Sequence, residues 1–360
     1  MLIDNKEWET IWLNKKKDII EVIDQTKLPH IFEIKEINNY EDAASAIQNM
    51  IIRGAPLIGV MGAYGLMLAL QENPSMENLK NSYEKLLSTR PTAVNLQWSL
   101  KRVFEKVSRT NKDERALIAR KEATKIKLED INMCSLIGDN GLRLIQDLVS
   151  RKNEKTINVL THCNAGWLAT VNWGTALSPI YKAHRAGIKI HVWVDETRPR
   201  NQGANLTAFE LKNEGIPHTV IVDNAGGHLM QQNLVDLVIV GSDRTTKRGD
   251  VCNKIGTYLK ALAANANNVP FYAALPVSTI DWEIENGLKE INIETRSEKE
   301  ITHISGLTKN EKIETIRLSP EGSRAFNPGF DVTPNKLVTG LITEKGICNA
   351  TYDGLKNLYS

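Results

Sequence analysis

The sequence contains little cysteine and no nucleotide-binding fingerprint. Its four cysteines, Cys134, Cys163, Cys252 and Cys348, are widely separated and form no C-x-x-C pair, so neither a disulfide framework nor a zinc site is indicated. Reduced thiols, and hence a cytoplasmic protein, are the simplest interpretation. Neither a Walker sequence nor G-x-G-x-x-G occurs, so no nucleotide cofactor is expected.

An excess of charge of one sign is also missing. The 45 Lys and Arg residues nearly balance the 43 Asp and Glu residues, which leaves a net charge of +2. This balance gives no electrostatic footprint for nucleic acid or an anionic membrane, whereas a phosphate-bearing metabolite needs only a few cations. The longest apolar run, 57–70, is too short and too rich in glycine to span a bilayer. The N-terminus lacks the apolar core of a signal peptide, so we expect a soluble, intracellular protein.

The length of 360 residues, with 41% hydrophobic and 24% charged residues, favours two globular domains. We predict a smaller, mainly helical N-terminal domain over 1–128 and a catalytic domain over 129–360. The charge-rich stretch 113–148 is expected to form one or two long helices that join them. Apolar residues at helical spacing predict helices over 40–51, 58–70, 79–87 and 94–107, with one short strand over 30–37.

From residue 156 the pattern changes to short β-branched runs separated by helix-sized segments. This alternation predicts an α/β fold with a Rossmann-like, doubly wound parallel sheet and helices on both faces. Ligands bind such sheets at the carboxyl ends of the strands, and polar turns follow each run. The polar segment 283–321 is expected to be irregular. The five runs are 157–160, 188–194, 218–222, 234–240 and 270–275.

Cys163 follows the first of these strands and is a candidate proton carrier or nucleophile. A helix is expected to begin near Trp167, and the positive end of its dipole would lower the pKa of the thiol. The alternative is a small buried core residue. The residues by themselves leave the two interpretations equally supported.

Asp243 follows the fourth strand and is a candidate general acid. Loss of hydration at the mouth of a buried sheet should raise its pKa, so that it holds a proton near neutrality. An N-cap, or a partner for Arg244, is the commoner role of an Asp after a strand. Asp195 and Glu196 form a rival acid pair. The turn 223–228 contains one Asp and one His, which is more typical of a hydrogen-bonded loop than of a metal site, so no metal is expected.

Three cations stand close to expected helix starts. Arg53 lies in R-G-A-P, Arg90 in R-P-T, and Lys254 immediately before a helix expected from Ile255. Free N–H groups and the helix dipole favour phosphate at such positions, and a cation adds to this. Each one alone is weak support, because Lys and Arg usually cover solvent-exposed surface.

Seven segments, in this order along the chain, together resemble the methylthioribose-1-phosphate isomerase family. Their order and number make the match far more specific than any one motif. They are R-G-A-P-L-I-G (53–59), S-T-R-P-T-A-V-N (88–95), T-H-C-N-A-G (161–166), D-E-T-R-P-R-N-Q-G-A-N-L-T-A-F-E-L (195–211), G-S-D-R (241–244), G-D-V-C-N-K-I-G-T (249–257) and N-P-G-F-D-V-T-P (327–334).

The resemblance implies conversion of 5-methylthioribose 1-phosphate into 5-methylthioribulose 1-phosphate, an aldose–ketose isomerisation in methionine salvage. It implies a homodimer without metal or organic cofactor, with a small sugar phosphate as its ligand. By resemblance, Asp243 protonates the ring oxygen and Cys163 moves a proton between carbon 2 and carbon 1. The substrate contacts that it implies are Arg53, Gly54, Ala55, Arg90, Gln202, Asn253 and Lys254, of which Gln202 was not indicated by the local pattern.

Two alternatives stay open within this resemblance. The larger group includes regulatory subunits of a translation-initiation nucleotide exchange factor, which share the fold without this catalysis. Cys163 and Asp243 distinguish the enzymes from them. The same scaffold also resembles enzymes acting on 5-deoxyribose 1-phosphate, and residues 245–248, Asn205 and Gly329 depart from the commoner family pattern.

Overall fold

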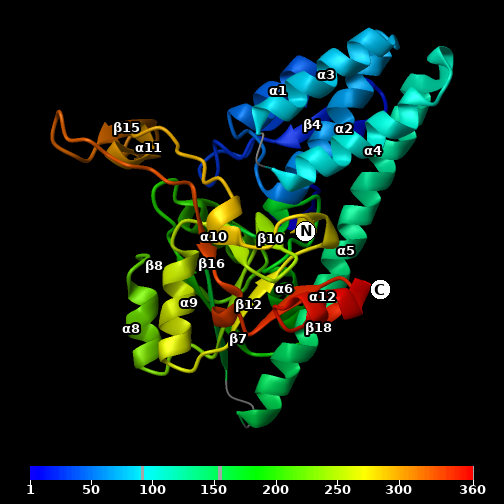
Figure 1. Ribbon diagram of the computed structural model, residues 1–360. Coiled ribbons are helices and arrows are strands. Elements are labelled where there is room, and N and C mark those ends of the chain that lie inside the picture. The colour runs from blue at the N-terminus through cyan, green and yellow to red at the C-terminus, as the bar shows by residue number, and fades with distance from the viewer. Residues whose placement is uncertain (91–92, 153–155, 360) are drawn as a thin grey trace.

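A single long helix, α5 (Arg115–Arg151), runs along one side of the whole molecule (Figure 1). The computed structural model describes residues 1–90, 93–152 and 156–359. The prediction of one or two long helices is confirmed as one. The predicted boundary at residue 128 lies within it: Ile126 belongs to the N-terminal apolar core and Ile137 to the core beneath the large sheet. The division into two domains stays a prediction.

The four predicted N-terminal helices are confirmed. Helix α2 is apolar on all sides because α1, α3, α4 and α5 all pack against it. By length and composition it passes as a membrane span, but 89% of it is buried inside the protein, as in a core helix. The helices are α1 (Tyr40–Gln48), α2 (Ala55–Glu72), α3 (Met76–Thr89) and α4 (Val94–Ser108).

The N-terminal region contains more β-structure than predicted. A three-stranded antiparallel sheet precedes α1, and only its last strand falls within the predicted strand 30–37. The other strands were missed because they are short and their pairing is not local in sequence. The strands are β1 (Leu2–Ile3) with β2 (Lys6–Glu7), and then β3 (Ile11–Asn14), β4 (Ile19–Ile23) and β5 (Ile34–Ile37).

A seven-stranded sheet forms the lower half of the molecule, in the order β18-β17-β12-β9-β6-β7-β8. All five predicted strands are present and parallel, which confirms an α/β fold with a mainly parallel sheet and a helical N-terminal region. Strand β17 extends the parallel part, and β18 pairs antiparallel at the edge. The strands are β6 (Ile157–Thr161), β7 (Ile190–Asp195), β8 (His218–Ile221), β9 (Leu237–Val240), β12 (Phe271–Ala274), β17 (Gly340–Thr343) and β18 (Gly346–Cys348).

The order of strands reverses between β6 and β9. The chain first builds outward from β6 to β7 and β8, then returns to the other side of β6 and continues through β9 and β12. Loops that leave two adjacent strands in opposite directions create a crevice at their carboxyl ends. Cys163 follows β6 and Asp243 follows β9, so the topology places both at this crevice.

A second, four-stranded sheet in the order β13-β10-β11-β16 covers the crevice. The segment 283–321, expected to be irregular, contains short helices and a hairpin that protrudes from the molecule (Figure 1). These strands are β10 (Arg244–Thr246), β11 (Val251–Lys254), β13 (Ile280–Asp281) and β16 (Phe330–Thr333), and the hairpin is β14 (His303–Leu307) with β15 (Ile313–Arg317).

Helices cover the sheets. The remaining α-helices are α6 (Ser178–Arg185), α7 (Ala208–Asn213), α8 (Ala225–Gln231), α9 (Thr257–Ala266), α10 (Gly287–Glu290), α11 (Lys299–Thr302) and α12 (Tyr352–Tyr359). Short 3₁₀ or π turns are η1 (Lys112–Glu114), η2 (Trp167–Ala169), η3 (Gly203–Thr207), η4 (Val277–Thr279) and η5 (Asn335–Leu337).

Candidate active site

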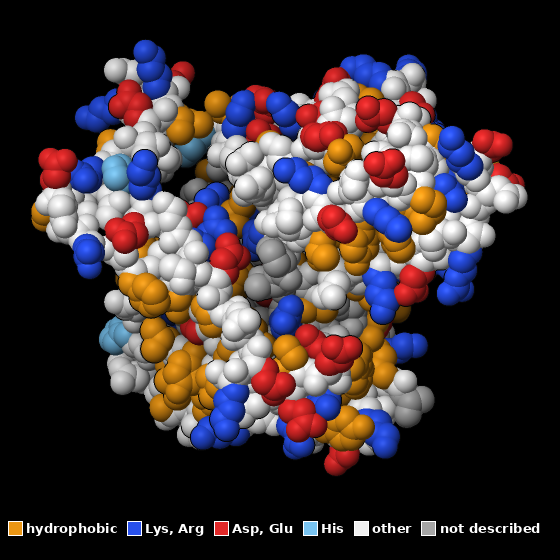
Figure 2. Space-filling model, turned by 45° about the horizontal axis from the view of Figure 1, so that its top comes forward, with side chains coloured by type: hydrophobic (Ala, Val, Ile, Leu, Met, Phe, Trp, Pro, Cys, Tyr) orange, Lys and Arg blue, Asp and Glu red, His pale blue; other side chains and the backbone are white. Residues whose placement is uncertain are grey.

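One cavity at the crevice gathers every residue predicted for the site. A hollow opens between the lobe that carries the β14–β15 hairpin and the N-terminal helices, and Lys and Arg side chains gather at its edge (Figure 2). The residues come from the sheet, from the N-terminal helices and from the covering sheet, so only the folded chain brings them together. The predicted residues that line it are Arg53, Gly54, Ala55, Arg90, Cys163, Gln202, Asp243, Asn253 and Lys254.

The backbone of Cys163 is held in a strained conformation by threonines. Its φ of 66° lies in the left-handed region that non-glycine residues seldom adopt. The Cys163 N–H donates to Thr197 Oγ1 over 2.8 Å, and Thr207 Oγ1 donates to the Cys163 carbonyl over 2.7 Å. Strained backbone that is fixed from both sides concentrates at functional sites. These bonds fix where the thiol meets the cavity.

The predicted low pKa of Cys163 is wrong. No long helix begins after it: η2 has three residues, and the N–H groups of Trp167 and Leu168 both donate to the Glu210 carboxylate over 3.0 Å. The helix-start N–H groups are therefore already occupied. Burial raises the pKa of the thiol, and the positive charges of Arg53 and Lys254 act in the opposite direction.

The predicted high pKa of Asp243 is confirmed. Burial raises it, while Arg90 and Lys254 act in the opposite direction. The Asp243 N–H donates to the Cys252 carbonyl over 2.9 Å, which ties the residue to β11. Arg244 has a carboxylate neighbour in Asp281, at 3.7 Å, and so points to a different acid. A carboxyl group that resists ionisation, facing a cavity, is suited to donating a proton.

Arg53 is a buried cation aimed at the cavity from the start of α2. It is 8% exposed, and its Nη1 donates to the Asn164 carbonyl over 3.0 Å. The Asn164 amide in turn donates to Glu210 Oε1 over 2.9 Å. Burial lowers the pKa of Arg53, which nevertheless remains a cation because guanidinium starts so high. A chain of hydrogen bonds thus fixes the guanidinium beside Cys163.

The N-terminus of α2 borders the same cavity and has no side-chain cap within the described residues. Gly54 is its N-cap, has a φ of 92°, and makes no side-chain cap hydrogen bond. A Cβ on Gly54 would lie 2.3 Å from the Ala169 carbonyl oxygen, so only glycine allows the helix to begin this close to the cavity loop. Helix N–H groups and the adjacent Arg53 together favour a phosphate here.

Lys254 reaches the cavity from a strand end and not, as predicted, from a helix start. It is the last residue of β11, whereas α9 begins at Thr257. The N–H groups at the start of α9 are already occupied, because Gly256 N–H and Tyr258 N–H donate to the Asp331 carboxylate over 2.7 and 3.1 Å. Burial lowers the pKa of Lys254, and its neighbour Asn253 is 5% exposed and donates to Thr257 Oγ1.

Three buried polar atoms of residues that line the cavity have no hydrogen-bond partner within the described residues. They are Gln202 Oε1, an acceptor, and Arg53 Nε and Arg90 Nε, both donors. Buried polar atoms are almost always paired, so an unpaired acceptor and donor beside one cavity indicate a polar ligand. Gln202 itself was found only through the resemblance, since nothing in its local pattern marks it.

Several cavity residues were missed by sequence reasoning. Arg296 lines the cavity from the segment expected to be irregular. It pairs with Glu294 over 2.7 Å and with Glu300 over 2.8 Å. Burial raises the pKa of Glu300, but Arg296 and Arg200 outweigh it and lower that pKa to about 2. No periodicity marks this segment, so only tertiary contacts reveal Arg296. The other residues missed are Met50, Pro56, Ile58, His162, Asn164, Ala165, Ala169, Thr170, Thr175, Gly241, Ser242 and Phe330.

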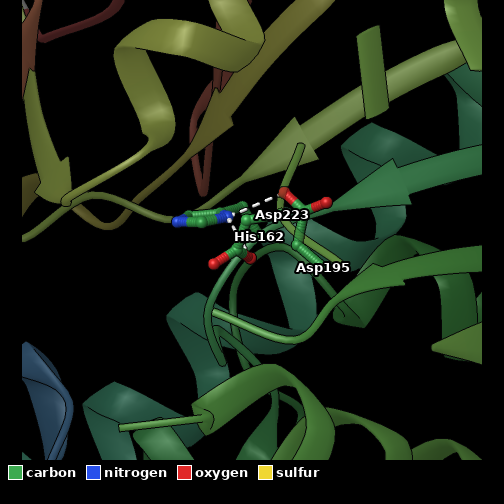
Figure 3. Close-up of side chains that lie close together, drawn as sticks. All are labelled: His162, Asp195 and Asp223. Atoms are coloured by element: carbon green, nitrogen blue, oxygen red, sulfur yellow. Dashed lines mark hydrogen bonds and ion pairs between the residues drawn. The ribbon is translucent and has the colours of Figure 1, made fainter. Parts of the chain in front are cut away.

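Asp195, one of the rival acids, lies behind the cavity in a buried cluster. His162, Asp195 and Asp223 have the residue types of a metal site, and the imidazole of His162 faces both carboxylates (Figure 3). His162 Nδ1 lies 2.8 Å from Asp195 Oδ2, and its Nε2 lies 2.8 Å from the Ile255 carbonyl. Both ring nitrogens thus already have an oxygen partner within the described residues.

Lys260 supplies the positive charge in this cluster. Its Nζ lies 2.9 Å from Asp195 Oδ2, and Lys260 and Asp195 are 3% and 0% exposed. The cluster therefore needs no metal ion to balance Asp195. It joins the ends of β6 and β7 to α9 directly behind Cys163, and its role is to position the cavity wall.

The variant Lys260→Met is expected to lower stability by about 3 kcal/mol, because it leaves the Asp195 carboxylate buried beside His162 alone. Methionine keeps most of the volume, so lost packing contributes little. The free energy of unfolding, measured in urea, checks this. Lys336→Met removes an exposed lysine and should change it by less than about 0.5 kcal/mol. Equal stability of the two variants would contradict the role given to Lys260.

The fold and the site together define an enzyme for a small anionic ligand. A thiol and a carboxyl group, both with a raised pKa, lie with several buried cations around one cavity. Comparison with known proteins agrees. Residues 51–350 match the Initiation factor 2 subunit family. The methylthioribose-1-phosphate isomerase of Methylocella silvestris is 58% identical over 356 residues, which cover 99% of this chain and 97% of that protein.

Solved structures point the same way. The 5-methylthioribose 1-phosphate isomerase from Pyrococcus horikoshii OT3 matches with a TM-score of 0.83 and 39% identity, covering 98% of this chain and 96% of the other. The translation initiation factor eIF-2B, subunit delta, from A. fulgidus matches with a TM-score of 0.79 and 38% identity, covering 98% and 99%. The chain belongs to the methylthioribose-1-phosphate isomerase family, within the Initiation factor 2 subunit family.

Proposed function

We propose that this protein converts 5-methylthioribose 1-phosphate into 5-methylthioribulose 1-phosphate, with Asp243 and Cys163 as its proton-transferring groups. The reaction belongs to methionine salvage. The observation that carries the proposal is that a thiol and a carboxyl group, both with a raised pKa, border one cavity together with buried cations. The names of the similar proteins supply the substrate.

The phosphate is assigned to the end of the cavity where α2 begins. There the start of α2, at Gly54 and Ala55, lies beside Arg53, and Lys254 lines the same cavity. A dianion at this point gains from the helix dipole and from charge-assisted hydrogen bonds. The unpaired Gln202 Oε1 is then placed to accept a hydrogen bond from a sugar hydroxyl.

The chemistry follows from the phosphate on the anomeric oxygen, which prevents spontaneous opening of the ring to an aldehyde. Asp243, whose pKa is raised by burial, donates a proton to the ring oxygen as the bond from that oxygen to carbon 1 breaks. Cys163, as the thiolate, then takes the proton from carbon 2, which forms the carbon 1–carbon 2 double bond of an enol. It returns this proton to carbon 1 while the carbon 2 hydroxyl gives its own proton to the Asp243 carboxylate, which leaves the 2-ketone and restores both groups. Arg53 and Lys254 favour the thiolate while it carries out the first of these steps.

The burial of the site supports retention of the transferred proton. The walls around the half-buried Cys163 and Asp243 are closely packed: Arg53, Asn164, Gln202, Asn253 and Lys254 are each at most 8% exposed. Exclusion of water strengthens the interactions of charged groups and limits side reactions. The catalytic groups come entirely from this chain, and the reaction is proposed to need no cofactor.

The deoxyribose and translation-factor alternatives are less well supported. The departures at Asn205, Gly329 and residues 245–248 do not border the active-site cavity, as far as its described lining shows, so they give no reason to change the substrate. A regulatory subunit would need neither a neutral acid nor buried cations around a cavity. Recovery of initiation-factor subunits with the purified protein, without isomerase activity, would reverse this ranking.

The test is an isomerase assay without added cofactor on 5-methylthioribose 1-phosphate and on 5-deoxyribose 1-phosphate. Formation of the ketose, followed by NMR, is expected with both, and the specificity constant should be higher for the methylthio sugar. A higher kcat/KM for the deoxy sugar would make 5-deoxyribose 1-phosphate the substrate in place of the methylthio sugar. No conversion of either would reject the function.

We also propose that the protein acts as a cytoplasmic homodimer. Helix α9 offers an apolar surface in Tyr258, Leu259 and Leu262, which are 37%, 61% and 39% exposed, and apolar side chains gather on the corresponding side of the molecule (Figure 2). Exposed apolar patches often mark association surfaces. Light scattering after size exclusion should give twice the chain mass of 40.3 kDa. A mass equal to one chain would contradict the dimer.

A further inference from the structure

A second cavity, called the annex here, adjoins the active-site cavity on the side of Asp243. The residues that border both cavities are Asp243, Arg90, Ala55, Ile58 and Phe330. Cys163 and Lys254, in contrast, border only the active-site cavity. The walls of the annex are mostly apolar and consist mainly of Ala55, Ile58, Ala93, Cys252, Ile291 and Phe330.

The annex suits a small apolar group. Ile291 is 9% exposed and packs with Cys252 in a separate apolar cluster, and Ile58 of α2 is 3% exposed. Besides Arg90 and Asp243, two further polar residues border the annex. Arg244 is directed to Asp281, at 3.7 Å, and Asn292 is exposed to solvent.

We propose that the annex holds the methylthio group on carbon 5 of the substrate, a proposal that rests on the isomerase function given above. The ring oxygen, which Asp243 protonates, is bonded to carbon 1 on one side and to carbon 4 on the other. Cys163 acts at carbons 1 and 2. Carbon 4 and its attached carbon 5 are therefore assigned to the side of Asp243 away from Cys163, and the annex borders Asp243 without bordering Cys163.

The chemistry of the walls decides what the annex accepts. A thioether is soft and apolar, so it packs against Ile58, Ile291 and Phe330 without losing hydrogen bonds to water. A hydroxyl group in the same place would lose such bonds. A bare methyl group would fill less of the space. The annex therefore selects for the methylthio sugar over 5-deoxyribose 1-phosphate, and Ile291 is a specificity-determining residue.

The test compares the two sugars on Ile291→Phe, which places a larger ring into the annex. Its kcat/KM for the methylthio sugar is expected to fall by about 10- to 100-fold, and that for 5-deoxyribose 1-phosphate by less than about 3-fold. Ile291→Ala, which removes part of the wall without added bulk, should lower the preference for the methylthio sugar by about 10-fold.

The matched control is Ile293→Phe, the same substitution two residues along the chain. Ile293 packs on the same apolar cluster but does not border the annex, so the ratio of the two specificity constants should equal that of the wild type. An unchanged ratio in both Ile291 variants, with the wild type active, would overturn the annex alone. Inactivity of the wild type on both sugars would overturn the proposed function and the annex with it.

Discussion

Cys163→Ser is expected to lower kcat by about 10³-fold, within the range that a positioned acid–base group contributes. Serine keeps the shape of the side chain, but a hydroxyl group ionises far less readily than a thiol. It therefore cannot take the proton from carbon 2 of the sugar. Arg53 and Lys254, which favour the thiolate here, do not compensate for so large a difference. Conversion of 5-methylthioribose 1-phosphate by the purified variant measures the effect.

The same variant should still bind substrate. The groups assigned to the phosphate and the sugar are unchanged. The Kd of the variant for the product, measured by calorimetry, should therefore stay within about 3-fold of the wild-type Kd for the same product. Cys348→Ser is the control: Cys348 lies on the edge strand β18, away from the cavity, and its loss should leave kcat unchanged. Full activity in Cys163→Ser would remove the thiol from the mechanism.

Asp243→Asn is expected to lower kcat by about 10²- to 10⁴-fold, because an amide cannot donate a proton to the ring oxygen as a carboxylic acid does. The wild type should also lose activity as pH rises through the raised pKa of Asp243, since the acid form is then lost. This decline should be absent from the residual activity of the variant. Initial rates across a pH series measure both effects.

Asp236→Asn is a matched control for Asp243→Asn. Asp236 immediately precedes β9, whereas Asp243 follows it, so the two lie at opposite ends of one strand. Asp236 accepts a hydrogen bond from Asn158 N–H over 2.8 Å and does not border the cavity. Its variant should keep wild-type kcat and the wild-type pH profile. An Asp243→Asn variant with the same profile as this control would assign the acid to another group.

The local sequence pattern was enough to predict a helix or strand where the spacing of apolar residues was clear. The β-branched runs around β6 and β9 are buried on both sides, so they read as strands without reference to the rest of the chain. The apolar helix α2 and the long helix α5 were likewise visible from their spacing. Short strands such as β3 and β10 were missed, because their stability depends on partners distant in sequence.

Some residues of the site could be predicted from the local sequence, and others could not. Arg53, Arg90 and Lys254 were visible as cations near apparent helix starts, and Asp243 as an acid after a buried strand. The direction of the pKa shift of Cys163 could not be predicted. Glu210, 47 positions further along the chain, accepts the hydrogen bonds of the N–H groups that were expected to act on the thiol. Nor was Arg296, whose segment has no period and is held by Glu294 and Glu300.

The sequence by itself determined the order of the strands along the chain, the family and the chemical groups available to the site. Tertiary structure decided which of those groups share a cavity, which helix start remains open to an anion, and that an apolar annex lies beside Asp243. The physical reason is that desolvation and pairing depend on neighbours brought close by the reversal of strand order between β6 and β9.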